Sequence, residues 1–336
     1  MRAVMIDAYG GSDKLYIAEA PKPEPGPGDV LIRLAYTAVN PADWKIREGM
    51  LDFTHVLPFP LIMGMDGAGV VEAVGEGVVE FRPGDRVLTL SEMAFGKGGT
   101  YAEYNVTPEP RVALLPANLS FAEGASMPIA SSSAASSVLD VAKVKAGDKV
   151  LLNGGAGGVG SFGVQFLRYL GCKVAATCST RNLDYVTGLG AERVIDYTRE
   201  NVTAAIAEWA PEGVDHVIDA VGQHSLPADL PRFVKSGGTI VCIQNLITGP
   251  GDYDQALAAS RGVRVLDNLL DAGFTDYVWG QVHAFRRLLG AVAEGAVKIP
   301  PFEILPLERV AEAHDRVRDG HVRGKIVLEI DASITR

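Results

Sequence analysis

The sequence of 336 residues predicts an α/β fold, with a doubly wound parallel sheet and a second, β-rich domain. Over about the first 120 residues, short apolar runs alternate with glycine and proline, as in a partly open barrel or a sandwich. From about residue 126, apolar runs of strand length alternate with helical patterns, which is typical of a parallel sheet with helices on both faces. A glycine-rich turn within this second part follows one such strand and opens one such helix.

Each expected strand is an apolar or alternating run that ends at glycine, proline or another turn residue. In the first part we expect strands at 1–7, 30–36, 69–74, 86–90 and 101–106. In the second part we expect strands at 150–153, 173–178, 193–196, 214–219, 239–243 and 263–266. A final helix is expected near 276–294, and the tail ends on a strand at 324–330.

The glycine-rich turn fits the fingerprint of a dinucleotide-binding site, Gly155-x-Gly157-x-x-Gly160. The first glycine permits a tight turn, the second lets the backbone approach a pyrophosphate, and the third lets helix and strand pack closely. The helix N-terminus offers free N–H groups to the phosphates. We therefore expect cofactor contacts from Ala156 to Gly160, that is Ala156, Gly157, Gly158, Val159 and Gly160. The alternative is a structural turn that binds nothing.

The end of the second parallel strand indicates which dinucleotide binds. An NAD site normally carries Asp or Glu there, whereas this chain reads Ser179, Thr180, Arg181, Asn182. The first carboxylate, Asp184, is expected inside the next helix. Hydroxyls beside an arginine suit a 2′-phosphate, because a guanidinium makes charge-assisted bonds to it. We expect NADP(H), with the alternative that these residues are an ordinary helix cap and a surface arginine.

Composition narrows the class of protein. The net charge of −10 argues against binding to nucleic acid or to an anionic membrane surface. No apolar run reaches membrane-spanning length, and the N-terminus lacks the apolar core of a signal peptide. The three cysteines, Cys172, Cys178 and Cys242, suggest a reducing compartment and buried thiols. We expect a cytoplasmic protein that acts on a small molecule.

Four segments carry a resemblance to a known family: 40–47 (Asn-Pro-Ala-Asp-Trp-Lys-Ile-Arg), 64–69 (Gly-Met-Asp-Gly-Ala-Gly), 156–160 and 321–325. Over essentially its whole length the chain resembles the medium-chain dehydrogenase/reductase superfamily, and within it the zinc-independent quinone oxidoreductase and enoyl reductase branch. The resemblance implies a GroES-like catalytic domain of residues 1–125 and 296–336, and a Rossmann NADP-binding domain of residues 126–295. The cofactor would lie in the cleft between them.

The branch is expected to work without metal. Zinc members bind the metal through Cys and His, whereas this chain has Gly64-Met65-Asp66 at the corresponding triplet and no cysteine at 40–43. Hydride addition to a C=C bond conjugated with a carbonyl needs less electrophilic help than reduction of a simple carbonyl. The resemblance therefore implies NADPH-dependent reduction of a quinone or an α,β-unsaturated carbonyl. A zinc-free alcohol or ketone dehydrogenase and a non-enzymatic, crystallin-like NADPH-binding protein are the alternatives.

The resemblance also names site residues. Asn40 and Asp43 are candidate catalytic residues, and Asn40, Trp44 and Asn245 are candidates for substrate contact. An Asn-Pro-x-Asp run is also a good turn and helix cap, so a purely structural role for the first two is the alternative. The tyrosine that contacts substrate in some relatives is not found at 49–51, which reads Gly-Met-Leu. His55 and Tyr101 are possible substitutes, and a structural role is the default for both.

Further cofactor contacts are implied at single positions, namely Ser133, Tyr197, Val221, Asn245 and Lys325. In the serine-rich segment 131–137, Ala135 stands where relatives carry an aromatic residue. Serines that cap and line the start of a helix explain this segment most simply, and a wider substrate pocket is the alternative. A homodimer is expected through the strand at 263–266, because an apolar sheet edge is usually covered.

Overall fold

The computed structural model describes residues 1–50, 57–222, 224–243, 253–268, 280–320 and 322–334. The chain forms two compact units, one of Met1–Ile129 with Pro301–Arg336 and one of Ala130–Pro300. The divisions fall a few residues after the expected boundaries at 125 and 295. Each unit is built around its own sheet, and the mixed α/β class is confirmed.

The second unit contains a six-stranded parallel sheet in the order β11-β10-β9-β12-β13-β14. Its strands are β9 (Lys149–Asn153), β10 (Lys173–Cys178), β11 (Arg193–Asp196), β12 (Val214–Asp219), β13 (Val234–Cys242) and β14 (Arg264–Asp267). The chain starts at a central strand, moves to one edge, and then returns to build the other half. This is the strand order of the dinucleotide-binding Rossmann fold, so the predicted doubly wound sheet is confirmed.

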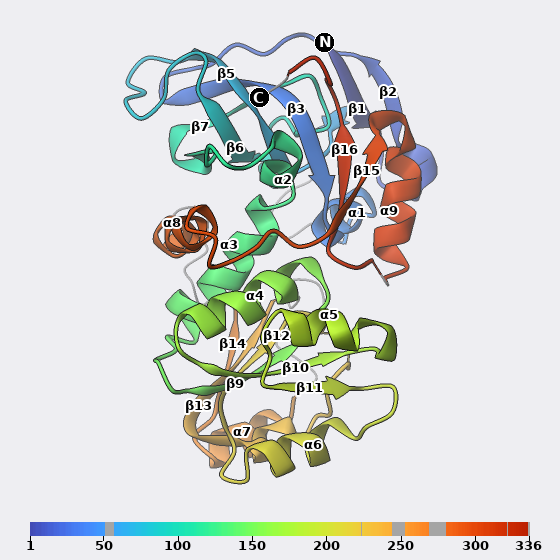
Figure 1. Cartoon of the computed structure of the whole chain (residues 1–336). Coiled ribbons are helices and arrows are strands. Elements are labelled where there is room, and N and C mark those ends of the chain that lie inside the picture. The colour runs from blue at the N-terminus through green and yellow to red at the C-terminus, as the bar shows by residue number, and fades with distance from the viewer. Residues whose placement is uncertain (51–56, 223, 244–252, 269–279, 321, 335–336) are drawn as a thin grey trace. The chain divides into compact units, whose positions relative to one another are not determined.

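Helices cover both faces of this sheet, as Figure 1 shows. On one face lie α4 (Gly158–Tyr169) and α5 (Leu183–Gly188), and on the other α6 (Val202–Trp209) and α7 (Gln255–Ser260). Because both faces are covered, central strands such as β9 read as continuous apolar runs. The expected helix at 276–294 is α8 (Gly280–Ala293), and its predicted first residues lie outside the described part.

The serine-rich segment forms α3 (Pro128–Ser136), which continues into a π-helical turn at Ser137–Val141. The hydroxyls of Ser136 and Ser137 both donate hydrogen bonds to the amide oxygen of Asn268, at 3.4 and 2.9 Å. The serines of this segment line a buried helix, as the simpler interpretation expected, but these two bonds lie at the end of α3 rather than at its start. Ala135 is fully buried in the same helix.

The first unit contains two sheets. The larger has the order β15-β16-β3-β5-β6-β8, with β7 also paired to β3, and the smaller has the order β2-β1-β4. The strands of these two sheets are β1 (Arg2–Ile6), β2 (Tyr16–Glu19), β3 (Asp29–Val39), β4 (Leu61–Ile62), β5 (Asp66–Val74), β6 (Arg86–Leu90), β7 (Tyr104–Pro108), β8 (Val112–Leu114), β15 (Phe302–Pro306) and β16 (Lys325–Glu329). The tail strand β16 pairs with β3, so the last residues of the chain complete a sheet that its first residues begin.

The described residues of the first unit include three α-helices, α1 (Pro41–Arg47), α2 (Phe121–Ala125) and α9 (Val310–Arg318). Asn40 caps α1 with Pro41 at its first position, which confirms the predicted turn and cap. Helix α9 packs on α1, and its inward side carries Val310, Ala313 and His314. The apolar core beneath combines residues of both sheets, including Val4, Ile32, Leu34, Ile326 and Leu328.

Four predicted strand boundaries are wrong by three residues or more: β3 extends to Val39 rather than 36, β5 begins at Asp66 rather than 69, and the starts of β7 and β13 also differ. The strand expected from 101 begins at Tyr104, because Ala102 makes only an isolated bridge to Ala3 and the fully buried Tyr101 joins a polar network. Strand β13 begins at Val234 rather than 239. The sequence analysis missed its first residues because Lys235, Ser236 and Gly237 break the apolar pattern. The errors at the starts of β7 and β13 both arise where burial does not follow the local hydropathy of the sequence.

Candidate functional site

The glycine turn between β9 and α4 confirms the expected strand–turn–helix context. Gly154 adopts φ of +85°, a conformation that favours glycine. A Cβ atom on Gly160 would lie 2.1 Å from the carbonyl oxygen of Gly154, so only glycine fits there. Gly160 thus explains the close approach of helix and strand without any ligand.

Gly157 behaves differently. A Cβ atom at this position would lie 3.6 Å from the Gly154 carbonyl oxygen, which is an ordinary van der Waals contact. Its φ of −76° and ψ of 173° are also open to other residues. The fold therefore does not need glycine here. Gly157 is the N-cap of α4 and offers no side-chain cap, so its position suits an anion that approaches the backbone closely. The turn therefore fits a dinucleotide phosphate.

A polar network ties this turn to the carboxyl ends of neighbouring strands. The N–H of Gly154 donates to Thr177 Oγ1 at 2.9 Å, and the Thr177 hydroxyl donates to Asn153 Oδ1 at 2.6 Å. The Asn153 amide then donates to Asp219 Oδ1 at 2.8 Å. Sequence analysis missed Thr177 and Asp219 as supports of the turn. The signal was their place at strand ends, where ligands of such sheets bind.

The end of β10 places Ser179, Thr180 and the exposed Arg181 on one short turn. Asp184 lies in α5 and is exposed, as expected. Tyr197 is 53% exposed at the end of the neighbouring strand β11. No acid follows β10 directly, in agreement with the sequence.

An acid does approach this turn from β11. Asp196 accepts hydrogen bonds from Thr180 Oγ1 at 2.5 Å and from Thr198 Oγ1 at 2.6 Å, and these bonds lower the pKa of the Asp196 carboxyl. A hydroxyl has one proton to donate, so Thr180 in this arrangement has none for a phosphate. Ser179 and Arg181 are the other residues predicted at this turn whose side chains carry hydrogen-bond donors. Sequence analysis missed Asp196 because it belongs to another strand.

The other predicted cofactor residues of this unit lie as follows. Ala156 and Ser133 are buried, and Val221 is 42% exposed. A methyl of Val221 would lie 2.6 Å from a Cβ atom on Gly154, so Val221 flanks the glycine turn. Asn245 lies outside the described residues, as does His55 of the first unit.

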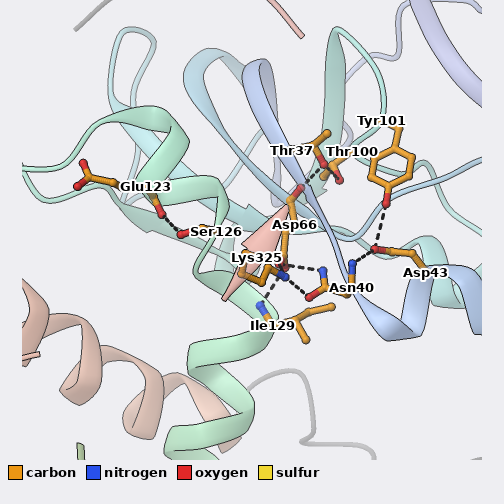
Figure 2. A network of polar contacts seen from close by, with 10 residues as sticks. All are labelled: Thr37, Asn40, Asp43, Asp66, Thr100, Tyr101, Glu123, Ser126, Ile129 and Lys325. Atoms are coloured by element: carbon orange, nitrogen blue, oxygen red, sulfur yellow. Dashed lines mark hydrogen bonds and ion pairs between the residues drawn. The ribbon is translucent and has the colours of Figure 1, made fainter. Parts of the chain in front are cut away.

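A second polar network lies inside the first unit and includes Asn40 (Figure 2). The Asn40 amide nitrogen donates to Asp66 Oδ2 at 2.9 Å, and Asn40 Oδ1 accepts from the ammonium of Lys325. Because the ammonium only donates and the carboxylate only accepts, the orientation of the amide is unambiguous. An amide has two N–H donors, and this arrangement uses one. The predicted cofactor contact of Lys325 stays a prediction.

Both carboxylate oxygens of Asp66 accept hydrogen bonds in this network. Its Oδ1 accepts from the N–H of Ile129 at 2.9 Å, and its Oδ2 lies 3.3 Å from Lys325 Nζ. Burial raises the pKa of the Asp66 carboxyl, and the charge of Lys325 opposes this rise. Next to it stands Met65, whose thioether is a poor zinc ligand. No group of three His, Cys, Asp or Glu side chains that could hold a metal occurs among the described residues.

Asp43 lies three residues after Asn40 and is fully buried. Its Oδ2 accepts from the backbone N–H of Asn40 at 2.7 Å and from the Tyr101 hydroxyl at 3.1 Å. Its Oδ1 is buried and has no hydrogen-bond partner among the described residues. Burial raises the pKa of Asp43 to about 7, against the lowering effect of the Asn40 bond.

Two further predicted residues of the first unit are described, Trp44 on α1 and Tyr101. Trp44 is half-buried, and its indole nitrogen is shielded without a hydrogen-bond partner in the described part of the chain. Tyr101 is buried, and its hydroxyl is bonded to Asp43 and His314. Sequence analysis missed His314 and Arg47, which reach this network from α9 and α1.

None of the described helices is long and apolar enough to cross a membrane.

Comparison with known proteins agrees with this arrangement. Models of two families match, the alcohol dehydrogenase GroES-like domain over residues 26–117 and the zinc-binding dehydrogenases over residues 189–328. The chloroplastic NADPH-dependent alkenal/one oxidoreductase of Arabidopsis thaliana is 33% identical over 98% of this chain and 79% of that protein. A chloroplastic quinone-oxidoreductase homolog of Spinacia oleracea is 31% identical, and the match covers 98% of both chains.

Solved structures share the fold over almost the whole chain. A mycobacterial protein in complex with NADPH has a TM-score of 0.85 at 26% identity, covering 98% of this chain and 100% of that one. A crystal structure described as an NAD-dependent alcohol dehydrogenase has a TM-score of 0.85 at 32% identity, with the same coverage of both chains. The similarity therefore extends across both compact units.

Proposed function

Because the chain belongs to the medium-chain dehydrogenase/reductase superfamily, in its quinone oxidoreductase and enoyl reductase branch, we propose that it is an NADPH-dependent reductase of enones or quinones. Such a reductase transfers a hydride to the β-carbon of a C=C bond conjugated with a carbonyl, or to a quinone. The protein's part is to position the reactants and to stabilise the negative charge that develops on oxygen.

The Asn40 amide is the observation that carries this proposal. Lys325 and Asp66 fix the amide from either side and leave its second N–H as a donor of set direction. A preorganised donor aimed at a developing oxyanion contributes more than one that must first be oriented. We infer that Asn40 binds the substrate oxygen, with the partly buried indole of Trp44 beside it. Asn245 stays a candidate for substrate contact.

NADPH supplies the hydride, and this chain's residues hold its phosphates. We propose that the pyrophosphate lies on the turn Ala156–Gly160, where the fold itself does not demand glycine at Gly157. The 2′-phosphate is assigned to Ser179 and Arg181, with Tyr197 beside them. Ser133, Thr180, Val221, Asn245 and Lys325 remain proposed as further cofactor contacts.

The name of one matching family model refers to zinc, whereas we propose that this chain acts without a metal. Met65 offers only a thioether, and both oxygens of Asp66 already accept hydrogen bonds from Ile129, Asn40 or Lys325. A zinc site would require thiolate or imidazole ligands in their place. We further propose a location in the cytoplasm, as the sequence suggests.

The function is tested by mixing the purified protein with NADPH and a panel of an enone, a quinone and a simple ketone, with and without a chelator. We expect NADPH to be oxidised by the enone or the quinone, and chelation to have no effect. Turnover of the simple ketone alone would favour the alcohol dehydrogenase alternative. Binding of NADPH without any turnover would favour the non-enzymatic one, and inhibition by the chelator would refute metal independence.

We expect Arg181→Ala to raise the KM for NADPH by roughly 10- to 150-fold, because a hydrogen bond to a charged group contributes about 1.5–3 kcal/mol. The KM for NADH should stay nearly unchanged, since that cofactor lacks the 2′-phosphate. Arg232→Ala, at an exposed arginine paired with Asp229, is the matched control. Equal weakening of both cofactors would make Arg181 structural, and a wild type that prefers NADH would contradict the assignment of the site.

We expect a homodimer in which β14 pairs with β14 of a second copy. This strand pairs with β13 on one side, and Val265 and Leu266 are partly exposed at what is the last strand in the described sheet. Light scattering should give twice the mass of 35.6 kDa at micromolar concentration. A stable monomer would contradict this prediction.

A further inference from the structure

The hydrogen bonds around Asp43 have one possible direction. Arg47 Nη1 lies 3.1 Å from His314 Nδ1, and a guanidinium cannot accept a hydrogen bond, so Nδ1 accepts. The proton of the neutral imidazole is therefore on Nε2, which donates to the Tyr101 oxygen at 3.1 Å. The Tyr101 hydroxyl must then give its own proton to Asp43 Oδ2. Arg47 thus fixes the tautomer of His314, and His314 in turn fixes the direction in which the Tyr101 hydroxyl donates its proton.

This series of hydrogen bonds, from Arg47 through His314 and Tyr101 to Asp43, does not conduct protons. It passes through the fully buried Arg47, which is permanently charged and cannot relay a proton, and which also donates to the Gly10 carbonyl oxygen at 3.0 Å and to Glu48 Oε1 at 2.5 Å. Burial and the charge of Arg47 lower the pKa of His314 to about 3, so His314 stays neutral at physiological pH. The three residues are therefore suited to hold Asp43 in place rather than to supply it with protons.

The result is an asymmetric carboxyl group. Asp43 Oδ2 accepts two hydrogen bonds, from Asn40 N and from Tyr101, while Oδ1 accepts none from the described residues. Both donors stay in place whether or not Oδ1 carries a proton. Asp43 can thus be protonated or ionised without rearrangement of its neighbours, and the proton is confined to Oδ1.

We propose that Asp43 is the proton donor of the reaction through its Oδ1 atom, and that Tyr101 and His314 are positioning residues that act through it. This inference rests on the proposed reduction of an enone or quinone. Besides these residues, the charged groups that influence the pKa of Asp43 are Asp66 and Lys325. They act in opposite directions, since the charge of Asp66 disfavours and that of Lys325 favours the ionised carboxyl.

The proposed step balances with the hydride from NADPH as reductant. Hydride addition to the β-carbon of an enone leaves an enolate. The O–H bond at Asp43 Oδ1 then breaks, its proton forms a new O–H or C–H bond on the enolate, and Asp43 remains as a carboxylate. The N–H of Asn40 and the hydroxyl of Tyr101 stabilise that carboxylate until water reprotonates it.

The first test is Asp43→Asn, which keeps the size of the side chain but cannot supply the proton. We expect kcat for an enone to fall by roughly 10²–10⁴-fold, the usual contribution of general acid catalysis. The Kd for NADPH, titrated by fluorescence, should stay unchanged and shows that the variant is folded. A kcat within a few-fold of the wild type would overturn the assignment of Asp43.

The second test is Tyr101→Phe, which removes a bond that favours the carboxylate and so raises the pKa of Asp43. Because a donor must be protonated, kcat falls as pH rises through this pKa, and the variant should move that fall upward by roughly 1–2 pH units. Tyr36→Phe, which removes a hydroxyl bonded to Glu329 on the same sheet, is the matched control and should not shift the profile. An unshifted profile in Tyr101→Phe would contradict the positioning role.

A readout without turnover separates this inference from the proposed function. Infrared spectra of the wild type, taken between pH 5 and 9 with Asp43→Asn subtracted, should show one carboxyl band that disappears with rising pH, and later in Tyr101→Phe. Absence of that band would refute the proton on Asp43 even if enones are reduced. Failure to oxidise NADPH with any enone or quinone would instead refute the function, whatever the spectra show.

Discussion

Asn40→Ala should lower kcat/KM for an enone by roughly 10²–10³-fold, the range found when one donor to a developing oxyanion is removed. The reason lies in how the amide is held, since Lys325 on its oxygen and Asp66 on its nitrogen leave one N–H of fixed direction. Alanine removes that donor but keeps the backbone N–H that bonds Asp43. Steady-state kinetics with an enone at saturating NADPH measures the loss.

The control for this variant is Asn105→Ala. Asn105 is another buried amide of the same unit, and it donates to the carbonyl oxygens of Gly98 and Gly99. If both variants lose stability but only Asn40→Ala loses catalysis, the effect belongs to the oxyanion contact. Equal losses in both, or full activity in Asn40→Ala, would show that Asn40 has only a structural role.

The parts of the fold that sequence analysis predicted well are those in which local pattern and burial agree. Strands β9, β10 and β12 are covered on both faces, so their apolar runs mark their positions closely. The glycine turn was recognisable because its three glycines stand at a fixed spacing between one strand and one helix, a pattern that depends only on close neighbours in the chain. Asn40 was recognisable for the same reason, as a helix cap followed by proline.

The polar networks could not be predicted in this way. His314 lies on helix α9, and its bonds join it to Arg47 and Tyr101, which are 267 and 213 residues away in the sequence. Asp66 and Lys325 are separated by 259 residues. Such pairs depend on β16 and α9 returning to the first sheet, and no local period encodes which side chains then meet.

Asp196 shows the same limit at the cofactor turn. The acid that an NAD site normally carries after this strand is missing, as predicted, but Asp196 reaches Thr180 from the adjacent strand β11. A rule that depends on position along one strand overlooks a carboxylate that comes from its neighbour. The proposed preference for NADPH therefore requires that Arg181 outweigh this negative charge, which makes the arginine variant informative.

The glycine turn gives the last prediction, from a contrast between two of its glycines. Gly157→Ala should weaken NADPH binding by about 100-fold, because the new methyl group lies where a phosphate would approach the backbone and costs one or two bonds to a charged group. The fold itself should accept the change, since this Cβ meets its nearest neighbour at 3.6 Å. Melting of the apoprotein should therefore stay within a few degrees of the wild type, while titration with NADPH reveals the loss.

Gly160→Ala should behave in the opposite way. Its Cβ would lie 2.1 Å from the Gly154 carbonyl oxygen, so helix α4 must move away from the turn and the melting temperature must fall. Gly188→Ala in α5, where a Cβ meets nothing within 4 Å, controls for the substitution itself. Tight NADPH binding by a stable Gly157→Ala protein would mean that the phosphates do not lie on this turn, because a fold indifferent to glycine at that position leaves the ligand as the reason for it.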